Sequence, residues 1–275
     1  MNSTEFQTFI NDGLKKRRIK APIMNAVRLL RYCLFQLSLD HKELKALKNK
    51  YAGERCFIVG NGPSLTTDDL EALKNEHCFA FNRIYETFDK TSWRPEFYMV
   101  LDNDVMRTVA KNMDRLDSKY KFLNVMAKTM GVQKSDGVIF FCSFGPYRVK
   151  EFNYVKEKIS EDVSKYISLN YSVTGAAVEM AIYLGFKEIV FLGMDHNYSR
   201  YIDKDGIGHC DNSVTDYSLM TKHDFVYFIY KDALESCFMC YRKYCEEHGI
   251  KIVNATRGGK LEVFERADLD GYIRK

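Results

Sequence analysis

The chain has 275 residues, enough for one large domain or two small ones, and its 46% hydrophobic and 28% charged residues are ordinary for a globular protein. A net charge of +4 is too small to indicate nucleic-acid binding, and no run of about 18 apolar residues predicts a membrane-spanning helix. The eight cysteines are scattered through apolar segments, which is typical of buried thiols in a reducing cytoplasm.

Residues 1–50 predict a helical extension that differs from the rest of the chain. A basic cluster at residues 15–20 is followed by apolar residues at helical spacing as far as Leu37. Such a helix either lies on an anionic membrane surface through residues 15–37 or packs on the following domain with its charges in solvent. We expect the second unit, residues 51–275, to be a single domain.

The segment 56–69 predicts a strand, a sharp turn and a helix start. The apolar run Cys56–Val59 is closed by Gly-Asn-Gly-Pro, and Thr66 with Asp69 forms a capping-box pattern. This arrangement presents backbone N–H groups to an anion. Gly60 and Gly62 lack a Cβ, so a ligand can approach the backbone closely. The functional interpretation is a phosphate or ribose site; the alternative is a plain turn, because neither a Walker loop nor G-x-G-x-x-G is present.

Short apolar runs alternate with helical segments through the rest of the chain. Strands are expected over 77–81, 97–101, 120–126, 138–142, 188–192 and 250–253, and helices over 174–184 and 224–247. This alternation predicts an α/β fold with a mostly parallel sheet and flanking helices. Because ligands of such sheets bind at the carboxyl ends of the strands, the polar residues that follow strands should converge there: Asn61, Asn82, Asp102, Asp195 and Asn254.

Two patterns raise the question of a metal ion. Asp102 and Asp104 form a D-x-D that can hold a divalent cation against a diphosphate. We favour the alternative that Asp102 binds a ligand hydroxyl while Asp104 caps the next helix. Cys237 and Cys240 form a C-x-x-C without a second pair, which favours packing over zinc binding. The sequence therefore predicts no metal cofactor, with Asp102 and Asp104 as the place where one would bind.

Two polar loops near the end of the chain carry candidate catalytic groups. Tyr198, Arg200 and Tyr201 follow a buried strand and are able to donate to a leaving phosphate; packing is the alternative. His209 lies in a glycine-rich loop and is a candidate general base, with Asp211 to orient it. An ordinary surface histidine is the alternative. His196 and, less so, His223 are rival bases.

Taken together, these stretches resemble the domain-of-unknown-function-115 family, which includes the motility-associated-factor glycosyltransferases, and the bacterial sialyltransferases of glycosyltransferase family 42. The resemblance is discontinuous and spans about residues 55–264. Its strongest pieces are GNGPSL at 60–65, FNR at 81–83, TGAAVEMAIYLGFKEIVFLGMDHNY at 174–198 and IGH at 207–209.

The resemblance implies a Rossmann-like, GT-A-related fold and an inverting glycosyltransferase that uses a CMP-activated nonulosonic acid as donor. It implies that His209 is the general base and that Tyr198 and Tyr201 stabilise the leaving phosphate. It also implies donor contacts from Gly60, Asn61, Ser64, Asn82, Asp102, Thr174 and Gly175. To these we add Gly62, Asp195 and Arg200, which the turn, the strand ends and the polar loop indicate as substrate-binding residues.

The chain departs from the sialyltransferase pattern in two places. Ser172 stands where those enzymes carry an arginine, for which Arg83, Arg148 or Arg200 are possible substitutes. The acidic Asp102 also differs from the residue found there, so the donor is less well defined than the fold.

Two other functions fit the same residues. The broad family includes 6-hydroxymethylpterin diphosphokinases, whose Mg·ATP chemistry D-x-D would serve, and a non-catalytic nucleotide-binding partner protein is the third hypothesis. As partners we expect a nucleotide-sugar donor and a surface glycan or glycoprotein acceptor, with no nucleic acid; a homo-oligomer is compatible with the sequence. We expect a cytoplasmic location, peripheral on the membrane if residues 15–37 bind it.

Overall fold

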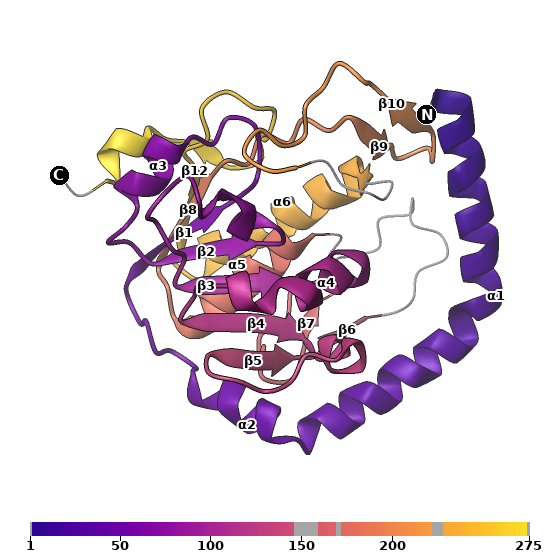
Figure 1. Ribbon diagram of the computed structural model, residues 1–275, viewed down its shortest axis with the longest axis horizontal. Coiled ribbons are helices and arrows are strands. Elements are labelled where there is room, and N and C mark those ends of the chain that lie inside the picture. Colours follow the sequence, from indigo (N-terminus) through magenta and orange to yellow (C-terminus); the bar gives the residue numbers. More distant parts are fainter. Residues whose placement is uncertain (1, 146–158, 169–171, 222–227, 274–275) are drawn as a thin grey trace.

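The computed structural model describes residues 2–145, 159–168, 172–221 and 228–273, and its centre is an eight-stranded sheet (Figure 1). The strand order is β13-β12-β8-β1-β2-β3-β4-β5, and every neighbouring pair is parallel. The strands are β1 (Arg55–Val59), β2 (Cys78–Phe81), β3 (Phe97–Val100), β4 (Tyr120–Asn124), β5 (Val138–Phe141), β8 (Glu188–Leu192), β12 (Lys251–Asn254) and β13 (Glu265–Arg266). The predicted α/β, Rossmann-like fold is confirmed.

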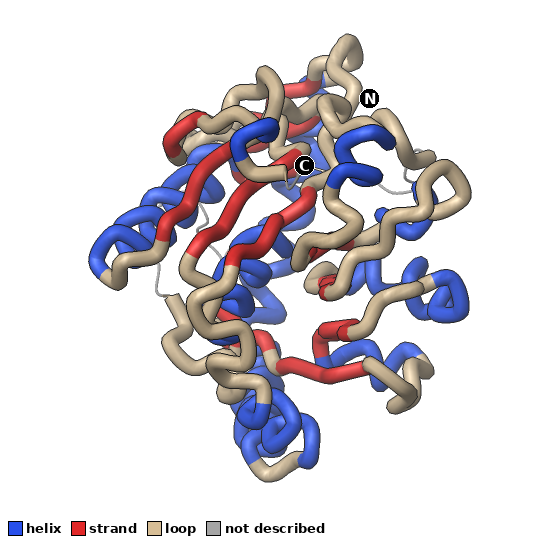
Figure 2. Tube along the Cα trace, turned by 90° about the vertical axis from the view of Figure 1, so that its left-hand side faces the viewer, coloured by secondary structure: helices blue, strands red, loops and turns tan. Residues whose placement is uncertain are grey.

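Both faces of this sheet are buried, which explains why its strands are almost continuously apolar. Alternate residues of β1 enter two separate cores: Cys56 and Ile58 on one face, Phe57 and Val59 on the other. One face is covered by α2 (Leu39–Ala46), α5 (Val173–Leu184) and α6 (Lys231–Glu247). The other is covered by α3 (Thr67–Ala72), α4 (Asn103–Val109) and the 3-10 turns η1 (Ile84–Thr87), η2 (Ala110–Arg115), η3 (Val125–Met130) and η4 (Leu269–Gly271). Figure 2 shows helices on both sides of the strands.

Two small sheets were not predicted. The strands β9 (Arg200–Ile202), β10 (Gly208–Cys210) and β11 (Ile229–Tyr230) form one; β6 (Ser143–Phe144) and β7 (Ile167–Ser168) form the other. The expected helix over 224–247 was wrong at its start, because α6 begins only at Lys231 and the two residues before it pair with β9. Residues 224–227 lie outside the described residues. The aromatic side chain of Phe228 packs against Phe6, so a run that looked like a helix face belongs to a sheet edge.

The long helix α1 (Ser3–Gln36) confirms that the N-terminal segment is helical, and it bends around the molecule near Pro22 (Figure 1). Its first turns pack Phe6 and Ile10 against Ile202 of the small sheet. Its last turn places Phe35 in the core of the main sheet, where α2 also contributes residues. Nowhere in the described residues is there a helix with the length and apolar character needed to span a bilayer.

Candidate functional site

The polar residues expected to converge do follow adjacent strands. Since β12, β8, β1, β2 and β3 are parallel neighbours, their carboxyl ends form one edge of the sheet. Asn61, Asn82, Asp102 and Asp195 lie just beyond four of these ends, whereas Asn254 is the last residue of β12. Asn254 is fully buried and has a structural role, because its side chain donates to the Leu261 carbonyl (3.0 Å) and accepts from a nearby backbone N–H.

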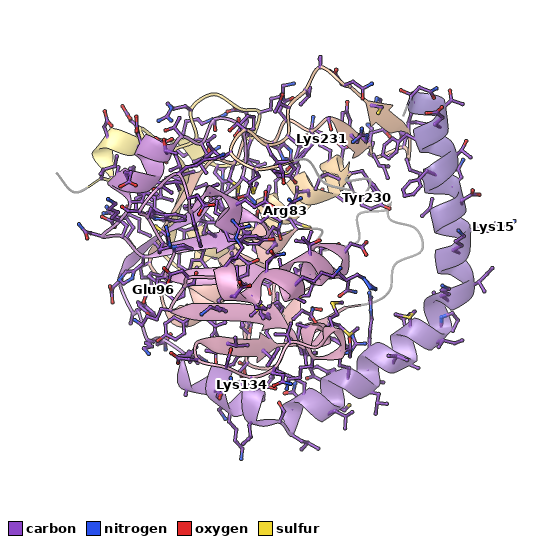
Figure 3. All side chains as sticks on the ribbon, viewed as in Figure 1. Lys15, Arg83, Glu96, Lys134, Tyr230 and Lys231 are labelled. Carbon is purple, nitrogen blue, oxygen red and sulfur yellow. The ribbon has the colours of Figure 1, made fainter. Side chains whose placement is uncertain are left out.

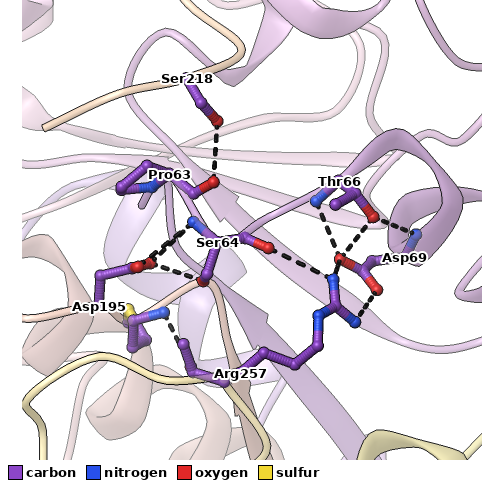
Figure 4. A network of polar contacts seen from close by, with 9 residues as sticks. Pro63, Ser64, Thr66, Asp69, Asp195, Ser218 and Arg257 are labelled. Carbon is purple, nitrogen blue, oxygen red and sulfur yellow. Dashed lines mark hydrogen bonds and ion pairs between the residues drawn. The ribbon is translucent and has the colours of Figure 1, made fainter. Parts of the chain in front are cut away.

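The turn after β1 is closed by the loop that follows β8 (Figure 4). Ser64 donates to the Asp195 carboxylate from its hydroxyl (2.7 Å) and from its backbone N–H (3.3 Å). A Cβ added to Gly62 would lie 1.9 Å from Asp195 Oδ2, and one added to Gly60 would lie 2.3 Å from the Gly193 carbonyl. The room that we expected these glycines to leave for a ligand is therefore taken up by the protein's own loop.

An ion pair fixes the helix that follows the turn. The predicted capping box is present: Thr66 and Asp69 bond each other reciprocally at the start of α3. Arg257 donates to both oxygens of Asp69 and to the Ser64 carbonyl (Figure 4). Burial opposes ionisation of Asp69, but the hydrogen bonds from Arg257 and Thr66 outweigh it and lower the pKa of the carboxyl. The anion at this helix start is Asp69 itself.

Asn61 and Asn82 differ from these satisfied groups. The Asn61 amide nitrogen lies 3.4 Å from the Phe81 carbonyl, but its Oδ1 has no hydrogen-bond partner among the described residues. Asn82 Oδ1 is also buried and lacks a donor there. The Asn82 backbone adopts φ +54°, and Tyr98 donates its hydroxyl to the Asn82 carbonyl. Because buried acceptors are rarely left unpaired, two of them at neighbouring strand ends make this edge of the sheet the candidate ligand site.

The D-x-D segment has its two acids in other roles than expected. Asp102 Oδ1 accepts from the backbone N–H groups of Asp104 (2.8 Å) and Val105 (3.0 Å), so Asp102 is the cap of α4. The expectation that Asp104 would be the cap was wrong; its side chain pairs with Arg107 at 3.7 Å. Over the described ranges, no three His, Cys, Asp or Glu side chains are grouped as metal ligands.

The start of α5 is built by packing between helices. The Ser172 hydroxyl caps it by accepting from the Thr174 backbone N–H at 3.0 Å. A Cβ added to Gly175 would lie 2.9 Å from the Tyr241 hydroxyl, so this glycine makes room for α6. The Tyr241 hydroxyl donates to Glu179 at 3.2 Å. Burial raises the pKa of Glu179 to about 7, against the opposing effect of its hydrogen bonds.

His196, the rival base, is buried beside the β8 loop. It adopts φ +51°, and its side chain is only 2% exposed. Its Nε2 lies 2.8 Å from Glu235 Oε1, and its Nδ1 lies 3.3 Å from the Tyr198 hydroxyl. Burial lowers the pKa of His196, while the Glu235 carboxylate opposes that effect. His196 therefore orients Tyr198 and is not open to an acceptor.

His209 lies on β10, directly across from Tyr201 on β9. The two rings stack with centroids 4.6 Å apart, and His209 is 42% exposed. Its Nε2 lies 2.7 Å from Asp203 Oδ2. Asp203 therefore orients His209, and the expected partner, Asp211, instead accepts from Ser213. With Nε2–H bonded to a carboxylate, Nδ1 is the nitrogen able to accept a proton.

The segment after β10 returns from the small sheet to the strand ends. The Ser218 hydroxyl donates to the Pro63 carbonyl at 3.2 Å (Figure 4). Thr221 donates to Glu86 and accepts from Arg83, just beyond β2. Residues 211–221 therefore link the strand that bears His209 to the turn after β1.

The first five residues of α6 contact both the loop after β8 and the small sheet. Glu235 binds His196, as described above. Asp232 accepts from the Lys204 backbone N–H (2.6 Å), and the Lys231 ammonium lies 5.4 Å from the Tyr201 ring centroid. In Figure 3, Lys231 and Tyr230 lie at the end of α6 that faces the small sheet.

Three arginines were candidates to replace the one missing at Ser172. Arg83 is engaged with Glu86 and Thr221, and Arg148 lies outside the described residues. Arg200 lies on β9, and its buried Nε has no partner in the described part of the chain. Of the two that are described, Arg200 has the unused donor.

Comparison with known proteins decides the family. The model of the family described as "6-hydroxymethylpterin diphosphokinase MptE-like" matches residues 35–201. The chain belongs to this MptE-like family. The match confirms the resemblance expected from the sequence, and it covers the turn after β1, the strand ends and α5. His209 lies beyond the matched residues.

The solved structures that resemble the chain include two glycosyltransferases. The MAf glycosyltransferase from Magnetospirillum magneticum AMB-1 is 15% identical with a TM-score of 0.49, over 80% of this chain and 34% of that one. The chain thus spans about a third of that protein's length. The sialyltransferase CstII from Campylobacter jejuni, in complex with cytidine-5'-monophosphate, is 15% identical with a TM-score of 0.38, over 77% of this chain and 84% of that one. In its complex with CMP-3FNeuAc it is 16% identical with a TM-score of 0.43, over 78% of this chain and 85% of that one. No curated protein sequence matches the chain.

Several residues of the candidate site were missed from the sequence. Arg257 and Glu235 come from segments far along the chain from Asp69 and His196, and nothing in their local sequence indicated those contacts. Asp203 was also missed, because it lies beside His209 through the pairing of β9 and β10, which was not predicted.

Proposed function

We propose that this MptE-like protein is an inverting glycosyltransferase that moves a sugar from a nucleotide donor to a hydroxyl group. The proposed donor is a CMP-activated nonulosonic acid, and the proposed acceptor is a surface glycan or glycoprotein. The observation that carries the proposal is the pair of unpaired oxygens on Asn61 and Asn82, at the edge where parallel sheets bind ligands. The amino group of cytosine and the hydroxyls of ribose are donors of the kind these oxygens lack.

The reaction requires a base for the acceptor hydroxyl. His209 Nδ1 takes that proton while Asp203 holds Nε2–H. The acceptor oxygen attacks the anomeric carbon, the bond from that carbon to the phosphate oxygen breaks, and CMP leaves with the electron pair. Tyr201 and Arg200, and Tyr198 once its hydroxyl turns away from His196 Nδ1, supply donors to the developing phosphate charge.

The proposal is tested by turnover and by binding. His209→Ala should lower the transfer rate by roughly 10²–10⁴-fold, the usual effect of removing a general base, with the donor affinity unchanged. His248→Ala is the matched control, because His248 is exposed at the far end of α6 and its ring bonds the Tyr244 carbonyl of that helix. An unimpaired His209→Ala enzyme removes His209 from the mechanism. Loss of activity in EDTA would instead support a metal ion at Asp102 and Asp104.

A second candidate reaction is pyrophosphoryl transfer from ATP to a hydroxymethylpterin. The description of the matching family favours it. A ligand that binds the native state raises its melting temperature, so the two reactions differ in which nucleotide stabilises the protein. Stabilisation by CMP without metal supports glycosyl transfer. Stabilisation by ATP with Mg²⁺, but not by CMP, supports the kinase-like reaction.

The remaining alternative is a nucleotide-binding partner protein without turnover. This alternative is supported if nucleotides bind but none is consumed.

We propose a cytoplasmic location for the protein. All eight cysteines are among the described residues and none forms a disulfide, as is usual in reducing compartments. A homo-oligomer is part of this proposal, to be measured by light scattering.

A further inference from the structure

The outer face of α1 carries a continuous stripe of exposed apolar side chains. The stripe recurs every three or four residues, which keeps it on one side of a helix. Its members are between 42% and 85% exposed: Ile19, Ile23, Val27, Leu30, Leu34 and Leu37. Over 18 residues the stripe is about 27 Å long at the usual helical rise. Isolated exposed apolar residues need no explanation, but an aligned row of this length marks an interaction surface.

The inner face of the same helix is already occupied. Ala21 and Phe35 are buried, the Tyr32 ring lies 4.7 Å from that of Phe144, and Arg28 donates to the Gly145 carbonyl at 3.2 Å. These residues lie on the opposite side of the helix from the stripe. The stripe is therefore free to bind a partner without any movement of α1 away from the body of the protein.

The charge around the stripe indicates which partner fits. Between Gly13 and Leu39 the sequence has seven Lys or Arg residues and no Asp or Glu. Lys15, Lys16 and Lys20 are exposed beside the start of the stripe, and Lys15 points away from the body of the molecule in Figure 3. A second copy docked on the stripe would bring two such basic segments together, whereas an anionic lipid surface attracts them.

We propose that α1 docks the protein on an anionic lipid bilayer, with the stripe from Ile19 to Leu37 inserted among the acyl chains and Lys15, Lys16 and Lys20 at the headgroups. This is the geometry of an interfacial amphipathic helix lying parallel to the membrane. The inference does not depend on the reaction proposed above, since it uses no residue of the candidate site.

Vesicle sedimentation with the full chain tests the proposal. The protein should bind vesicles that contain phosphatidylglycerol and bind those of phosphatidylcholine alone far less. Ile23→Glu with Leu30→Glu should weaken binding more than about tenfold, because two apolar side chains leave the bilayer and two negative charges are added. Lys15→Gln and Lys16→Gln should each weaken it about fivefold at low salt.

Met239→Glu is the matched control, because Met239 is 54% exposed on α6, away from the stripe. It should bind vesicles as the unaltered chain does. An environment-sensitive fluorophore attached to the exposed Cys33 lies beside Leu34 on α1. Its emission should shift to shorter wavelengths on vesicle binding if this face is inserted.

Three results would overturn the proposal. The first is equal, weak sedimentation with both kinds of vesicle. The second is a loss of binding with Met239→Glu as large as with the α1 variants. The third is a dimer in light scattering that Ile23→Glu and Leu30→Glu convert to a monomer, without vesicle binding, which would make the stripe a contact between two copies.

Discussion

Asn61 and Asn82 follow neighbouring strands, and each keeps a buried amide oxygen without a donor in the described residues. A buried acceptor that gains no hydrogen bond on folding does not add to the stability of the native state. Asn254, at the end of β12, is bonded at both ends of its amide. We therefore propose a ligand-binding role for Asn61 and Asn82, whereas Asn254 has a structural one.

Asn61→Ala should leave the free energy of unfolding nearly unchanged and abolish the thermal stabilisation produced by the cognate nucleotide. Asn254→Ala is the control. It leaves the buried Leu261 carbonyl and Thr256 N–H without their hydrogen-bond partner, so it should lower the stability by roughly 1–3 kcal/mol. Melting temperatures with and without nucleotide measure both effects. A marked loss of stability in Asn61→Ala, with nucleotide binding intact, would assign Asn61 to the scaffold.

Glu179 predicts a pH dependence of stability. Burial raises its pKa to about 7 in the folded protein from an ordinary value of 4.5. The folded state thus holds the proton more tightly, and the stabilising contribution is full below pH 4.5 and is lost as the pH rises through 7. Relative to Glu179→Gln, the unaltered chain should lose roughly 2–3 kcal/mol between pH 5 and pH 8. Urea unfolding at the two pH values measures this difference; parallel curves for the two proteins would contradict it.

At the residue scale, the sequence predicted the positions of residues that follow parallel strands, because the carboxyl ends of such strands lie at one edge of the sheet. That rule placed Asn61, Asn82 and Asp195 at one edge of the sheet. It did not reveal that the Asp195 carboxylate bonds Ser64, because which of several converging side chains meet depends on the path of each loop.

At the scale of elements, the turn after β1 and the loop after β8 form one unit. Gly62 has no space for a side chain, since a Cβ would lie 1.9 Å from Asp195 Oδ2 and 2.7 Å from the Gly193 carbonyl. Gly62→Ala should therefore lower the stability by about 1–3 kcal/mol or more through overpacking. Gly13→Ala is the control: nothing lies within 4 Å of its Cβ position, and an interior helix glycine should gain about 0.5–1 kcal/mol. Equal unfolding midpoints for the two variants would refute the close approach.

Elements with a local signal were predicted well. Strand β8 has the bounds expected from the apolar run, and the capping box of α3 is formed by the two expected residues. The start of α6 was not predicted correctly, because the apolar and aromatic side chains of Ile229 and Tyr230 suit a helix or a strand equally. Their pairing with β9 is a long-range contact that local periodicity does not encode.

At the scale of the whole molecule, α1 connects the small sheet to the core of the main sheet. Phe6 is fully buried against the small sheet, so Phe6→Ala should destabilise that sheet by about 3–5 kcal/mol. Amide hydrogen exchange should then speed up in β9 and β10 and stay slow in β1 and β8. Phe9→Ala, at a 46% exposed position, should have a smaller effect. Unchanged protection of β9 and β10 would show that the small sheet does not depend on α1.

The same connection limits how the chain can be divided. The sequence predicted a separate extension up to residue 50, from its composition. The side chains of Phe35 and Leu44 enter the main core, so a cut at residue 50 would open that core as well as remove the exposed apolar stripe. Composition distinguishes a basic helix from an α/β domain, but it does not report what the helix packs against.

The N-terminal end of α6 contacts two loops. Glu235 bonds His196 of the β8 loop, and Asp232 and Lys231 contact the β9–β10 hairpin. A helix is stiff along its axis. If a bound nucleotide displaced α6, Tyr198 beside the β8 loop and His209 on the β9–β10 hairpin would therefore move together. Donor and acceptor binding would then be thermodynamically coupled, each changing the affinity for the other by the same factor.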